Sequence, residues 1–395
     1  MHTPISLRSL LGTGGLALTL TLAGCGSSDD STPLKPGQDA RLVGVVSTVA
    51  SDFTSGAVEL IDMSETDPVA SGAYFPTGSD IGVTARGQHY YRFGRFNIDT
   101  LQKVDVANPA QEIWQYSTLS AGDTASSNPY ALVFVNDTKA YLLRYNTSEA
   151  WIVNPSATSE DEFFSGETLD LSSYLPDNTQ GAPNMASGVV VDGKLFITLQ
   201  RLDSEYDPTN TAYVAVFDTD TDTEIDTGMG ENGLKGIPLI GRNPGGIQYH
   251  EDLGILVKNT GSYDTKEQTG VDRIDPETFA IEPLIADADT DVQLSDLVIV
   301  SDTQGYVLSY AGWKDTTLQS FNPSADTIEF TTVTSYAGGD YRDIELSPEG
   351  NLWLADATAN NPGIRILATA DNSEQAFIQT TLLPTGVAFT EIDDE

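Results

Sequence analysis

Cysteine and histidine are almost missing from this chain. Its 395 residues include one cysteine, Cys25, and three histidines. A single thiol can form neither an internal disulfide nor a multi-cysteine metal site. Because His2 lies close to the N-terminus, only His89 and His250 remain in the body of the chain, which argues against a histidine-rich zinc enzyme. No serine–histidine–aspartate set is apparent around these two residues.

Basic residues are also scarce. Lysine and arginine together number 19 against 58 aspartates and glutamates, which gives a formal net charge of −39. The acids are spread along the chain rather than gathered in one tail. Such a surface keeps a protein soluble and repels nucleic acid and anionic membranes. We therefore expect no nucleic-acid partner; a salt-adapted or secreted surface is the plain explanation, and a dedicated cation-binding role is the alternative.

Helical periodicity is nearly absent. Short β-rich runs instead alternate with turns of glycine, aspartate, asparagine and proline, which is typical of an all-β fold. The runs recur as a unit, seen most clearly over residues 186–218, where ASGVVV, a DGK turn, LFITLQ, a polar loop and AYVAVFD follow one another. A repeated unit of several strands predicts an array of small sheets rather than one large sheet.

The first strand of each repeat can be marked by one apolar residue. The seven markers are Val83, Leu132, Val189, Ile247, Leu297, Ile344 and Val387. Successive markers lie 43 to 58 residues apart, which suits four-stranded propeller blades with loop insertions. The sequence therefore predicts an all-β, seven-bladed β-propeller.

The two ends of the repeat complement each other. The segment 382–389, LLPTGVAF, has an inner strand with no second strand after it, whereas residues 42–63 lack an inner strand. We expect the C-terminal strand to complete the first blade, because a closed ring leaves no exposed sheet edge.

Two sequence segments resemble those of a known family. GKLFITLQ followed by AYVAVFDTDTDTEI, and GNLWLADATANNPGIRI, are similar to the repeats of YVTN-type, lactonase-like seven-bladed propellers. The resemblance covers most of the domain, and it implies a fold far more than a function.

The N-terminus has the layout of a bacterial export signal. Arg8 precedes an apolar run, Leu10–Leu22, and small residues follow. The run is shorter than the roughly 20 residues of a membrane span. The sequence Leu-Ala-Gly-Cys25 resembles a lipobox, which implies cleavage before a cysteine that carries acyl chains such as palmitate. An ordinary secretory signal with a stray cysteine is the alternative.

The predicted organisation has three parts: a signal peptide over 1–24, lipidated Cys25 with a flexible tether over 25–40, and the propeller over 41–395. The tether is polar and rich in serine, aspartate and proline, so it cannot bury enough apolar surface to order itself. Gly26, in place of aspartate, favours the outer membrane by the same resemblance, and the membrane face is left open. The predicted location is the cell envelope.

Candidate ligand contacts lie where second strands end and inner strands begin, because these ends meet at one mouth of a propeller. The candidates are Arg92, Arg144, Arg201, Arg242, Lys258, Trp313, Tyr341 and Arg342. Arginine offers forked donors to carboxylate or phosphate, and aromatic rings offer flat faces. They predict a pocket for an anionic, aromatic or conjugated ligand. The alternative is that each base pairs with a neighbouring acid.

Two weaker motifs concern metals. Asp218–Glu224 and Asp287–Asp291 alternate carboxylates as calcium loops do, but they lack the glycine and glutamate of a complete calcium-binding loop. Asp356 with Asn360 and Asn361 is similar to metal-binding gluconolactonase-like propellers, in one blade only. No cofactor is firmly implied, and calcium is the one candidate.

Three functions fit these observations. The first is an envelope lipoprotein that binds a small anionic ligand at the mouth, as an uptake accessory for a siderophore or cobalamin beside an outer-membrane transporter. The second is a lactonase-like, metal-dependent hydrolase that uses Asp356. The third is a scaffold for a protein partner.

Overall fold

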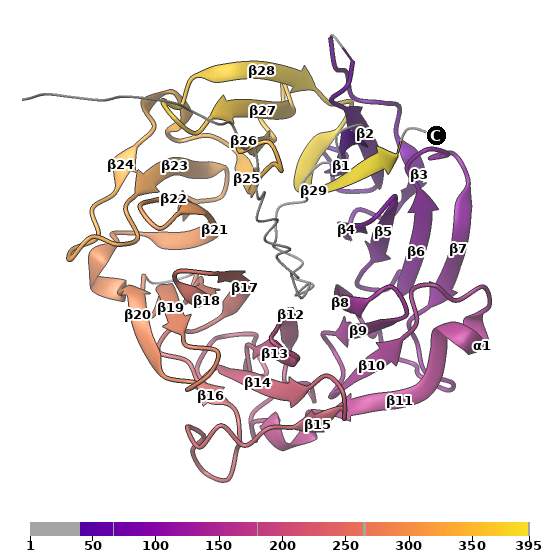
Figure 1. Cartoon of the computed structure of the whole chain (residues 1–395), viewed down its shortest axis with the longest axis vertical. Coiled ribbons are helices and arrows are strands. Elements are labelled where there is room, and N and C mark those ends of the chain that lie inside the picture. The colour runs from indigo at the N-terminus through magenta and orange to yellow at the C-terminus, as the bar shows by residue number, and fades with distance from the viewer. Residues whose placement is uncertain (1–39, 66, 180, 264–265, 394–395) are drawn as a thin grey trace, which may run out of the picture.

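The computed structural model describes residues 40–65, 67–179, 181–263 and 266–393. Seven antiparallel sheets stand side by side around a central channel (Figure 1). Each sheet is a blade, labelled A to G in the order in which the blades follow one another around the ring. The predicted all-β, seven-bladed propeller is confirmed. Cys25, the predicted signal and the predicted tether up to residue 39 lie outside the described residues, and Ala40, which was predicted as the last tether residue, begins the first strand.

The strands of each blade are given from the channel outward. Blade A contains β29 (Leu383–Asp393), β1 (Ala40–Val49), β2 (Gly56–Asp62) and β3 (Tyr74–Thr77). Blade B contains β4 (Ile81–Arg86), β5 (His89–Gly94), β6 (Thr100–Asp105) and β7 (Glu112–Ser117). Blade C contains β8 (Pro129–Asn136), β9 (Lys139–Arg144), β10 (Glu149–Val153) and β11 (Phe164–Asp170), with the short helix α1 (Glu160–Phe163) between the last two.

The remaining four blades follow the same plan. Blade D contains β12 (Met185–Val191), β13 (Lys194–Leu199), β14 (Tyr213–Asp218) and β15 (Thr223–Glu224), and β16 (Ile237–Pro238) also pairs with β14. Blade E contains β17 (Pro244–His250), β18 (Gly254–Asn259), β19 (Gly270–Ile274) and β20 (Ile281–Ile285). Blade F contains β21 (Gln293–Ser301), β22 (Gln304–Gly312), β23 (Asp315–Phe321) and β24 (Thr331–Thr332). Blade G contains β25 (Tyr341–Leu346), β26 (Asn351–Asp356), β27 (Gly363–Ala368) and β28 (Glu374–Gln379).

All seven marker residues fall on the innermost strands, β4, β8, β12, β17, β21, β25 and β29. The C-terminal strand closes the ring as predicted. β29 pairs with β1 over its whole length, from Ala40 opposite Asp393 to Val49 opposite Leu383. Blade A is therefore assembled from both ends of the domain: β29 supplies its inner strand, and β1, β2 and β3 supply the other three.

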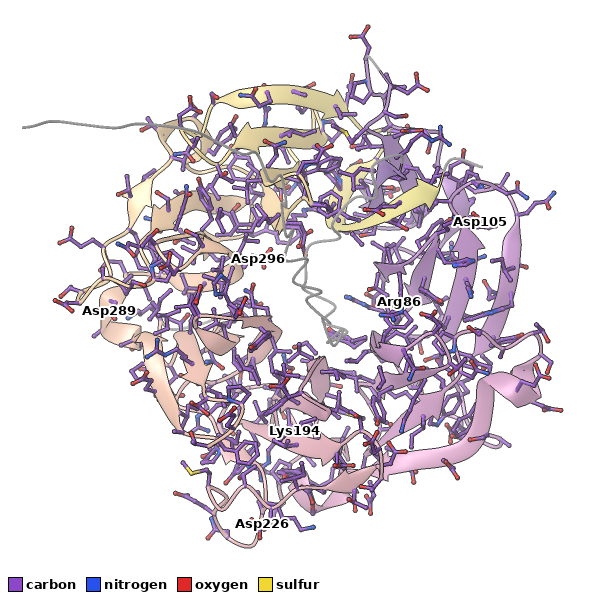
Figure 2. All side chains as sticks on the ribbon, in the orientation of Figure 1. Arg86, Asp105, Lys194, Asp226, Asp289 and Asp296 are labelled. Atoms are coloured by element: carbon purple, nitrogen blue, oxygen red, sulfur yellow. The ribbon has the colours of Figure 1, made fainter. Side chains whose placement is uncertain are left out.

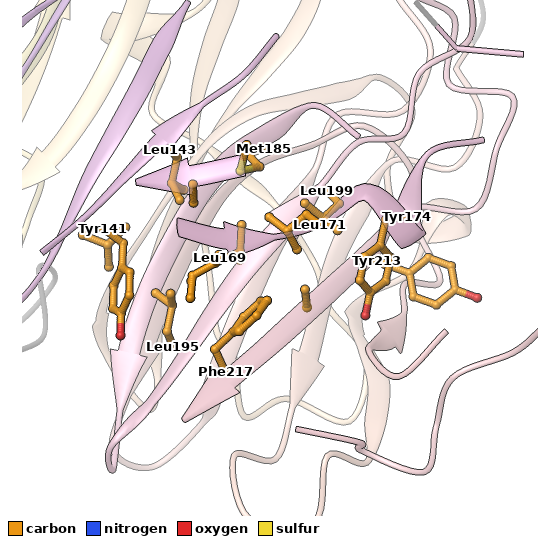
Figure 3. Packing of buried hydrophobic residues seen from close by; sticks show 14 of the residues in the cluster. Tyr141, Leu143, Leu169, Leu171, Tyr174, Met185, Leu195, Leu199, Tyr213 and Phe217 are labelled. Carbon is orange, nitrogen blue, oxygen red and sulfur yellow. The ribbon is translucent and has the colours of Figure 1, made fainter. Parts of the chain in front are cut away.

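The strands are apolar on both sides because each blade is sandwiched between two others. In β9, Ala140 and Leu142 pack against blade B, whereas Tyr141 and Leu143 pack against blade D. Figure 3 shows the interface between blades C and D, where Leu195 and Phe217 lie close to Tyr141 and Leu169. Burial on both faces explains why these strands read as continuous hydrophobic runs rather than as polar–apolar alternation.

Buried polar side chains fix the links between blades. Asp99 accepts hydrogen bonds from Ser126, Ser127 and the amide of Asn128 at the link from blade B to blade C. Asp272, in β19, accepts the amides of Ile240 and Gly241. A buried backbone amide must find an acceptor, so each of these carboxylates holds a link in one conformation.

Within the described residues, no helix is long and apolar enough to cross a bilayer.

Candidate functional site

One face of the ring gathers the exposed aromatic side chains. In each blade, the inner strand begins and the second strand ends on this face, which we call the mouth. The exposed aromatic residues of the described chain all lie in loops between a second and a third strand: Phe53, Phe96, Tyr206, Tyr263 and Trp313. Acidic residues, in contrast, are scattered around the ring, as Asp105, Asp226 and Asp289 illustrate (Figure 2).

A cavity of about 390 Å³ opens on the mouth between blades C, D and E, and we call it the tyrosine pocket. Its lining consists of Tyr130, Tyr145, Gln200, Leu202, Tyr206, Asp207, Pro208, Asn243, Ser262 and Tyr263. Four phenol rings therefore face one space, together with two amide side chains. This volume lies in the range of small-molecule sites.

The back wall of the pocket is pre-formed. The rings of Tyr130 and Tyr145 stack with centroids 4.5 Å apart. The Tyr145 hydroxyl donates a 2.5 Å hydrogen bond to Oε1 of Gln200, whose Nε2 donates to the carbonyl of Pro244. Burial, followed by the neighbouring phenols, raises the pKa of Tyr145, so it stays a neutral donor. Tyr130 and Tyr145 therefore form a fixed, flat wall on this side of the pocket.

Arg95 stands at the edge of this pocket. It follows β5 in the loop to β6, and its guanidinium lies over the Tyr130 ring, 4.5 Å from the centroid. The guanidinium also covers Gly82 on the inner strand β4, where a Cβ atom would come within 2.7 Å of Nη2. Arg95 lines a second hollow of about 400 Å³ that enters the channel past Phe53 and Gly82. It thus forms the boundary between the pocket and the channel entrance.

Arg95 and Arg242 differ from the other arginines of the described chain. Neither guanidinium hydrogen-bonds a carboxylate or a carbonyl, and one buried nitrogen of each, Nε of Arg95 and Nη1 of Arg242, has no partner. The other described arginines donate to acids or to backbone oxygens, as Arg273 does to Glu282. In a chain with a net charge of −39, two unpaired guanidinium groups on one face are an exception.

The channel wall carries its own charged cluster. Asp296 on β21 faces the channel (Figure 2) and accepts the amide of Ile344 in the next blade at 2.8 Å. Asp343 likewise accepts the amide of Val387 at 2.7 Å. The inner edge of each sheet would otherwise leave these amides unpaired. The two carboxylates therefore tie blade F to blade G and blade G to blade A.

Glu345 and Lys258 complete this cluster. Burial, and then the charge of Asp296, raises the pKa of Glu345 to about 8. Nζ of Lys258 donates to the carbonyl of Ser295 at 2.8 Å, and burial lowers its pKa although Asp296 and Asp343 oppose that change. The sequence placed Lys258 among the mouth residues, and the structure places its amino group against the inner strand of blade F.

Arg92 and Arg144 are buried between blades. Arg92 donates to the carbonyl of Phe75 and to Gln115. Arg144, only 1% exposed, donates to the carbonyl of Thr118 at 3.0 Å and to Asp123 at 3.1 Å, and its guanidinium covers Trp151. Their observed contacts are structural, and the ligand-binding role predicted for them stays a prediction.

Arg201 follows β13 and Arg242 precedes β17, so both lie on the mouth side of the ring. Arg201 donates to the carbonyls of Tyr174 and Thr211, both at 2.7 Å, and lies over the ring of Tyr213. The pKa of Arg242 is lowered by burial and then by the positive charge of Arg201. The charge of Arg201 thus acts, together with burial, against the charged form of Arg242.

Trp313 and Arg342 form a second aromatic group with Phe53. Trp313 is 67% exposed, and its ring centroid lies 5.9 Å from that of Phe53. The guanidinium of Arg342 lies 5.5 Å from the Phe53 centroid and 5.9 Å from that of Trp313, and it is held by a two-pronged ion pair to Asp340. Tyr341 is turned inward and packs edge-on against Tyr336.

In two of the candidate metal motifs, the carboxylates accept hydrogen bonds from, or form ion pairs with, other groups of the chain. Asp218 accepts hydrogen bonds within its own turn, and Asp222 pairs with Lys139 at 2.8 Å. Asp356 accepts Nε of Arg365 at 2.7 Å and the amide of Thr358 at 3.0 Å. In the described part of the chain, no three histidines, cysteines or carboxylates are grouped as metal ligands.

The sequence analysis missed Arg95, Tyr206 and Tyr263. Arg95 lies one residue beyond the second strand of its blade, so an alignment of strand ends stops short of it. Tyr206 and Tyr263 are lone aromatic residues in polar loops, and this isolation is the signal that could have marked them.

Comparison with known proteins supports the fold. No protein-family model and no curated protein matches the sequence. The periplasmic gluconolactonase PpgL of Pseudomonas aeruginosa superposes with a TM-score of 0.60 at 13% identity, over 88% of this chain and 99% of that one. A candidate 6-phosphogluconolactonase of Bacteroides fragilis gives 0.60 at 14% identity over 90% and 99%. Citrobacter koseri AztD gives 0.51 at 11% over 90% and 99%.

This chain shares their propeller fold. The predicted resemblance to lactonase-like propellers is confirmed at that level. Identities of 11 to 14% do not carry the chemistry of a site from one protein to another. The function must be argued from the mouth itself.

Proposed function

We propose that this chain is an envelope lipoprotein that captures a small, flat, anionic molecule at the mouth of its ring. The observation that carries the proposal is the unpaired guanidinium of Arg95, which lies 4.5 Å from the ring of Tyr130 at the edge of the tyrosine pocket. The flat part of the ligand lies among the phenol rings, and its anionic group meets Arg95.

The charge balance of the chain supports an anionic ligand. With 58 acids against 19 bases, a guanidinium at the surface has many carboxylates within reach. Arg95 bonds none of them, although Asp80 lines the same hollow. A buried donor without a partner costs about 1–3 kcal/mol, and a bound carboxylate or phosphate removes that cost through forked hydrogen bonds.

The shape of the pocket supports a flat ligand. Tyr130 and Tyr145 present one stacked wall, and Tyr206 and Tyr263 stand as exposed rings on loops of two other blades. Aromatic rings contribute large contact areas at little cost in conformational entropy. Gln200 and Asn243 add hydrogen-bonding groups that orient the ligand.

The direction of β1 indicates which face of the ring is joined to the N-terminal segment. Val49, the last residue of β1, lines the channel entrance at the mouth, so Ala40 lies on the opposite face of the ring. A lipid on Cys25 would be joined to that face by a tether that reaches roughly 50 Å when fully extended. The mouth would then face away from the anchoring membrane, toward incoming ligand, and delivery to a transporter in the same membrane would need the domain to turn on its tether.

Binding of defined probes tests the proposal. We would titrate the protein at low salt with benzoate, with its neutral analogue benzyl alcohol and with the non-aromatic cyclohexanecarboxylate, using calorimetry. We expect benzoate to bind best, and Arg95→Ala to weaken it at least tenfold while leaving benzyl alcohol unchanged. Arg273→Ala removes an arginine that is paired with Glu282, away from the pocket, and is the matched control.

Arg95→Lys separates charge from shape. It keeps the positive charge but loses the forked donors, so we expect intermediate benzoate affinity. The proposal fails if benzoate binds no better than benzyl alcohol, or if Arg95→Ala and Arg273→Ala have the same effect.

A further inference from the structure

The lining of the tyrosine pocket includes one charged side chain, and that side chain is acidic. Of the ten described residues that line the cavity, nine are tyrosine, leucine, proline, serine or amide residues, and the tenth is Asp207; none of the ten is a lysine or an arginine. Asp207 is exposed, and within the described chain its carboxylate accepts no hydrogen bond and joins no ion pair. The cavity therefore holds a negative group that no cation of its own lining balances.

The loop between β13 and β14 fixes Asp207 through its backbone. The amide of Asp207 donates to Oδ1 of Asp203 at 3.0 Å. The carbonyl of Asp207 accepts the amide of Asp203 at 3.0 Å and that of Thr209 at 2.9 Å. The amide of Tyr206 donates to the carbonyl of Asp203 at 3.0 Å. Because the loop is held by main-chain groups and by Asp203, the side chains of Tyr206 and Asp207 are left to line the pocket.

The phenol rings add negative potential to the same space. The face of an aromatic ring attracts a cation, and attraction is strongest where water is excluded. Tyr130 already shows this behaviour, because the Arg95 guanidinium lies 4.5 Å from its ring centroid. Tyr145, stacked on Tyr130, and the exposed rings of Tyr206 and Tyr263 line the same cavity. A cationic ring would be attracted both by these rings and by the unbalanced carboxylate.

The guanidinium and the carboxylate lie on different sides of the tyrosine wall. Arg95 follows β5 in blade B, whereas Asp207 lies in the loop from β13 to β14 of blade D. The stacked rings of Tyr130 and Tyr145 belong to blade C, which stands between blades B and D (Figure 1). A ligand that lies along this wall meets a positive group at one end and a negative group toward the other.

We infer that the flat part of the ligand is positively charged: the ligand is an aromatic cation, such as an N-substituted pyridinium ring, joined to a carboxylate or a phosphate. The ring lies among the phenols beside Asp207, and the acidic group meets Arg95. The inference rests on the proposed function, since it keeps the acidic group at Arg95 and adds the charge of the flat part. A positive ring also offsets the repulsion that a net charge of −39 exerts on a plain anion.

Two probes of equal shape test the charge of the ring. N-methylnicotinate and 3-methylbenzoate carry the same methyl and carboxylate groups, and they differ in that the first has a positively charged ring nitrogen where the second has carbon. Calorimetry at low salt would measure both. We expect N-methylnicotinate to bind roughly fivefold more tightly, which is the size of a cation–π attraction in a partly exposed site. The N-methylpyridinium ion, which lacks the carboxylate, should bind more weakly than N-methylnicotinate.

Asp207→Asn and Glu205→Gln form a matched pair of variants. Each removes one negative charge from an exposed residue of the same loop, but only Asp207 lines the pocket. We expect Asp207→Asn to lose most of the preference for N-methylnicotinate over 3-methylbenzoate and Glu205→Gln to keep it. Tyr206→Phe retains the ring face and should keep the preference, whereas Tyr206→Leu should lower it. Thermal unfolding would confirm that each variant is folded.

The outcomes separate the two proposals. If 3-methylbenzoate binding depends on Arg95 but N-methylnicotinate binds no more tightly, or if Asp207→Asn keeps the full preference, the cationic-ring inference is wrong and the proposed function stands. If the binding of neither acid depends on Arg95, both proposals are wrong, even where N-methylpyridinium itself binds.

Discussion

Glu59 of blade A accepts hydrogen bonds from the backbone amide of Thr381, 322 residues later in the chain, at 3.1 and 2.9 Å. It also accepts the amide of Leu382 at 3.1 Å. The buried carboxylate thus holds the last link of the ring against the first blade, just before β29 enters its place beside β1. Asp99 and Asp272 do the same at two other links.

Removing this carboxylate should destabilise the closure. We expect Glu59→Ala to lower the free energy of unfolding by about 1–3 kcal/mol, because it leaves two backbone amides without their acceptor. Glu59→Gln keeps one acceptor oxygen and should cost less. Urea unfolding measures both, with the exposed Glu277→Ala as a control expected to change stability by less than about 0.5 kcal/mol. Equal effects of Glu59→Ala and Glu277→Ala would show that the link does not depend on Glu59.

The architecture of the ring was predictable because each blade repeats one pattern. Markers such as Val83 and Ile344 recur at blade intervals, and the unmatched strand at 382–389 required a partner at the other end of the domain. The buried carboxylates that accept backbone amides at the links between blades were not predictable in the same way. Glu59 sits between the apolar residues Val58 and Leu60 of β2, and only the assembled ring shows which amides it meets.

The candidate site was harder to predict for a physical reason. Both faces of a blade are buried, so a side chain near the end of a second strand can point into an interface between blades instead of toward the mouth. Arg92 and Arg144 point into such interfaces. Arg95, one residue past the strand, is free of that constraint, and its lack of a partner can be seen only from the surrounding structure.

Glu345 should make stability depend on pH. The pKa of its carboxyl is raised from 4.5 to about 8 by burial and by Asp296, so the folded chain holds a proton that the unfolded chain releases. The free energy of unfolding should therefore fall as pH rises between about 4.5 and 8. One pKa unit corresponds to about 1.4 kcal/mol, and because the carboxylate is partly exposed to the channel we expect an effect on the order of 1–2 kcal/mol.

Glu345→Gln should flatten this part of the pH profile. Its charged neighbours Asp296 and Asp343, and Lys258 beyond them, remain in the variant, so any residual slope reports on them. Urea unfolding at pH 5 and pH 8.5 would compare the wild type, Glu345→Gln and the control Glu277→Gln. A wild-type stability that is unchanged or higher at pH 8.5 would contradict the raised pKa.

Cys25 is expected to hold the protein at a membrane. Cys25→Ser removes the only thiol of the chain, so the variant should move from the membrane fraction to the soluble fraction of the envelope while its thermal unfolding stays unchanged. Mass spectrometry of the N-terminal peptide should show a diacylated Cys25 in the wild type. An unmodified cysteine, or a wild-type protein that is soluble without detergent, would favour the ordinary secretory signal.

Trp313 offers a direct measure of local charge at the mouth. The other tryptophans of the described chain are buried: Trp114, Trp151 and Trp353. Trp313 is exposed, and Nζ of Lys314 and the guanidinium of Arg342 each lie 5.9 Å from its ring, with Asp340 as the neighbouring acid. The net negative charge of the whole chain repels anions. Lys314 and Arg342, however, lie well within the Debye length of about 10 Å from the Trp313 ring, so their positive charges act on an ion that approaches this ring.

We therefore expect iodide to quench Trp313 fluorescence more strongly than caesium does. The quenchable component should disappear in Trp313→Phe, which identifies it, and the ratio of iodide to caesium quenching should fall in Lys314→Ala. Neutral acrylamide, which responds to exposure alone, should quench the wild type and Lys314→Ala equally. Stronger quenching by caesium would show that acidic residues dominate the local charge beside Trp313. Lys314 and Arg342 would then not attract anions to this part of the mouth.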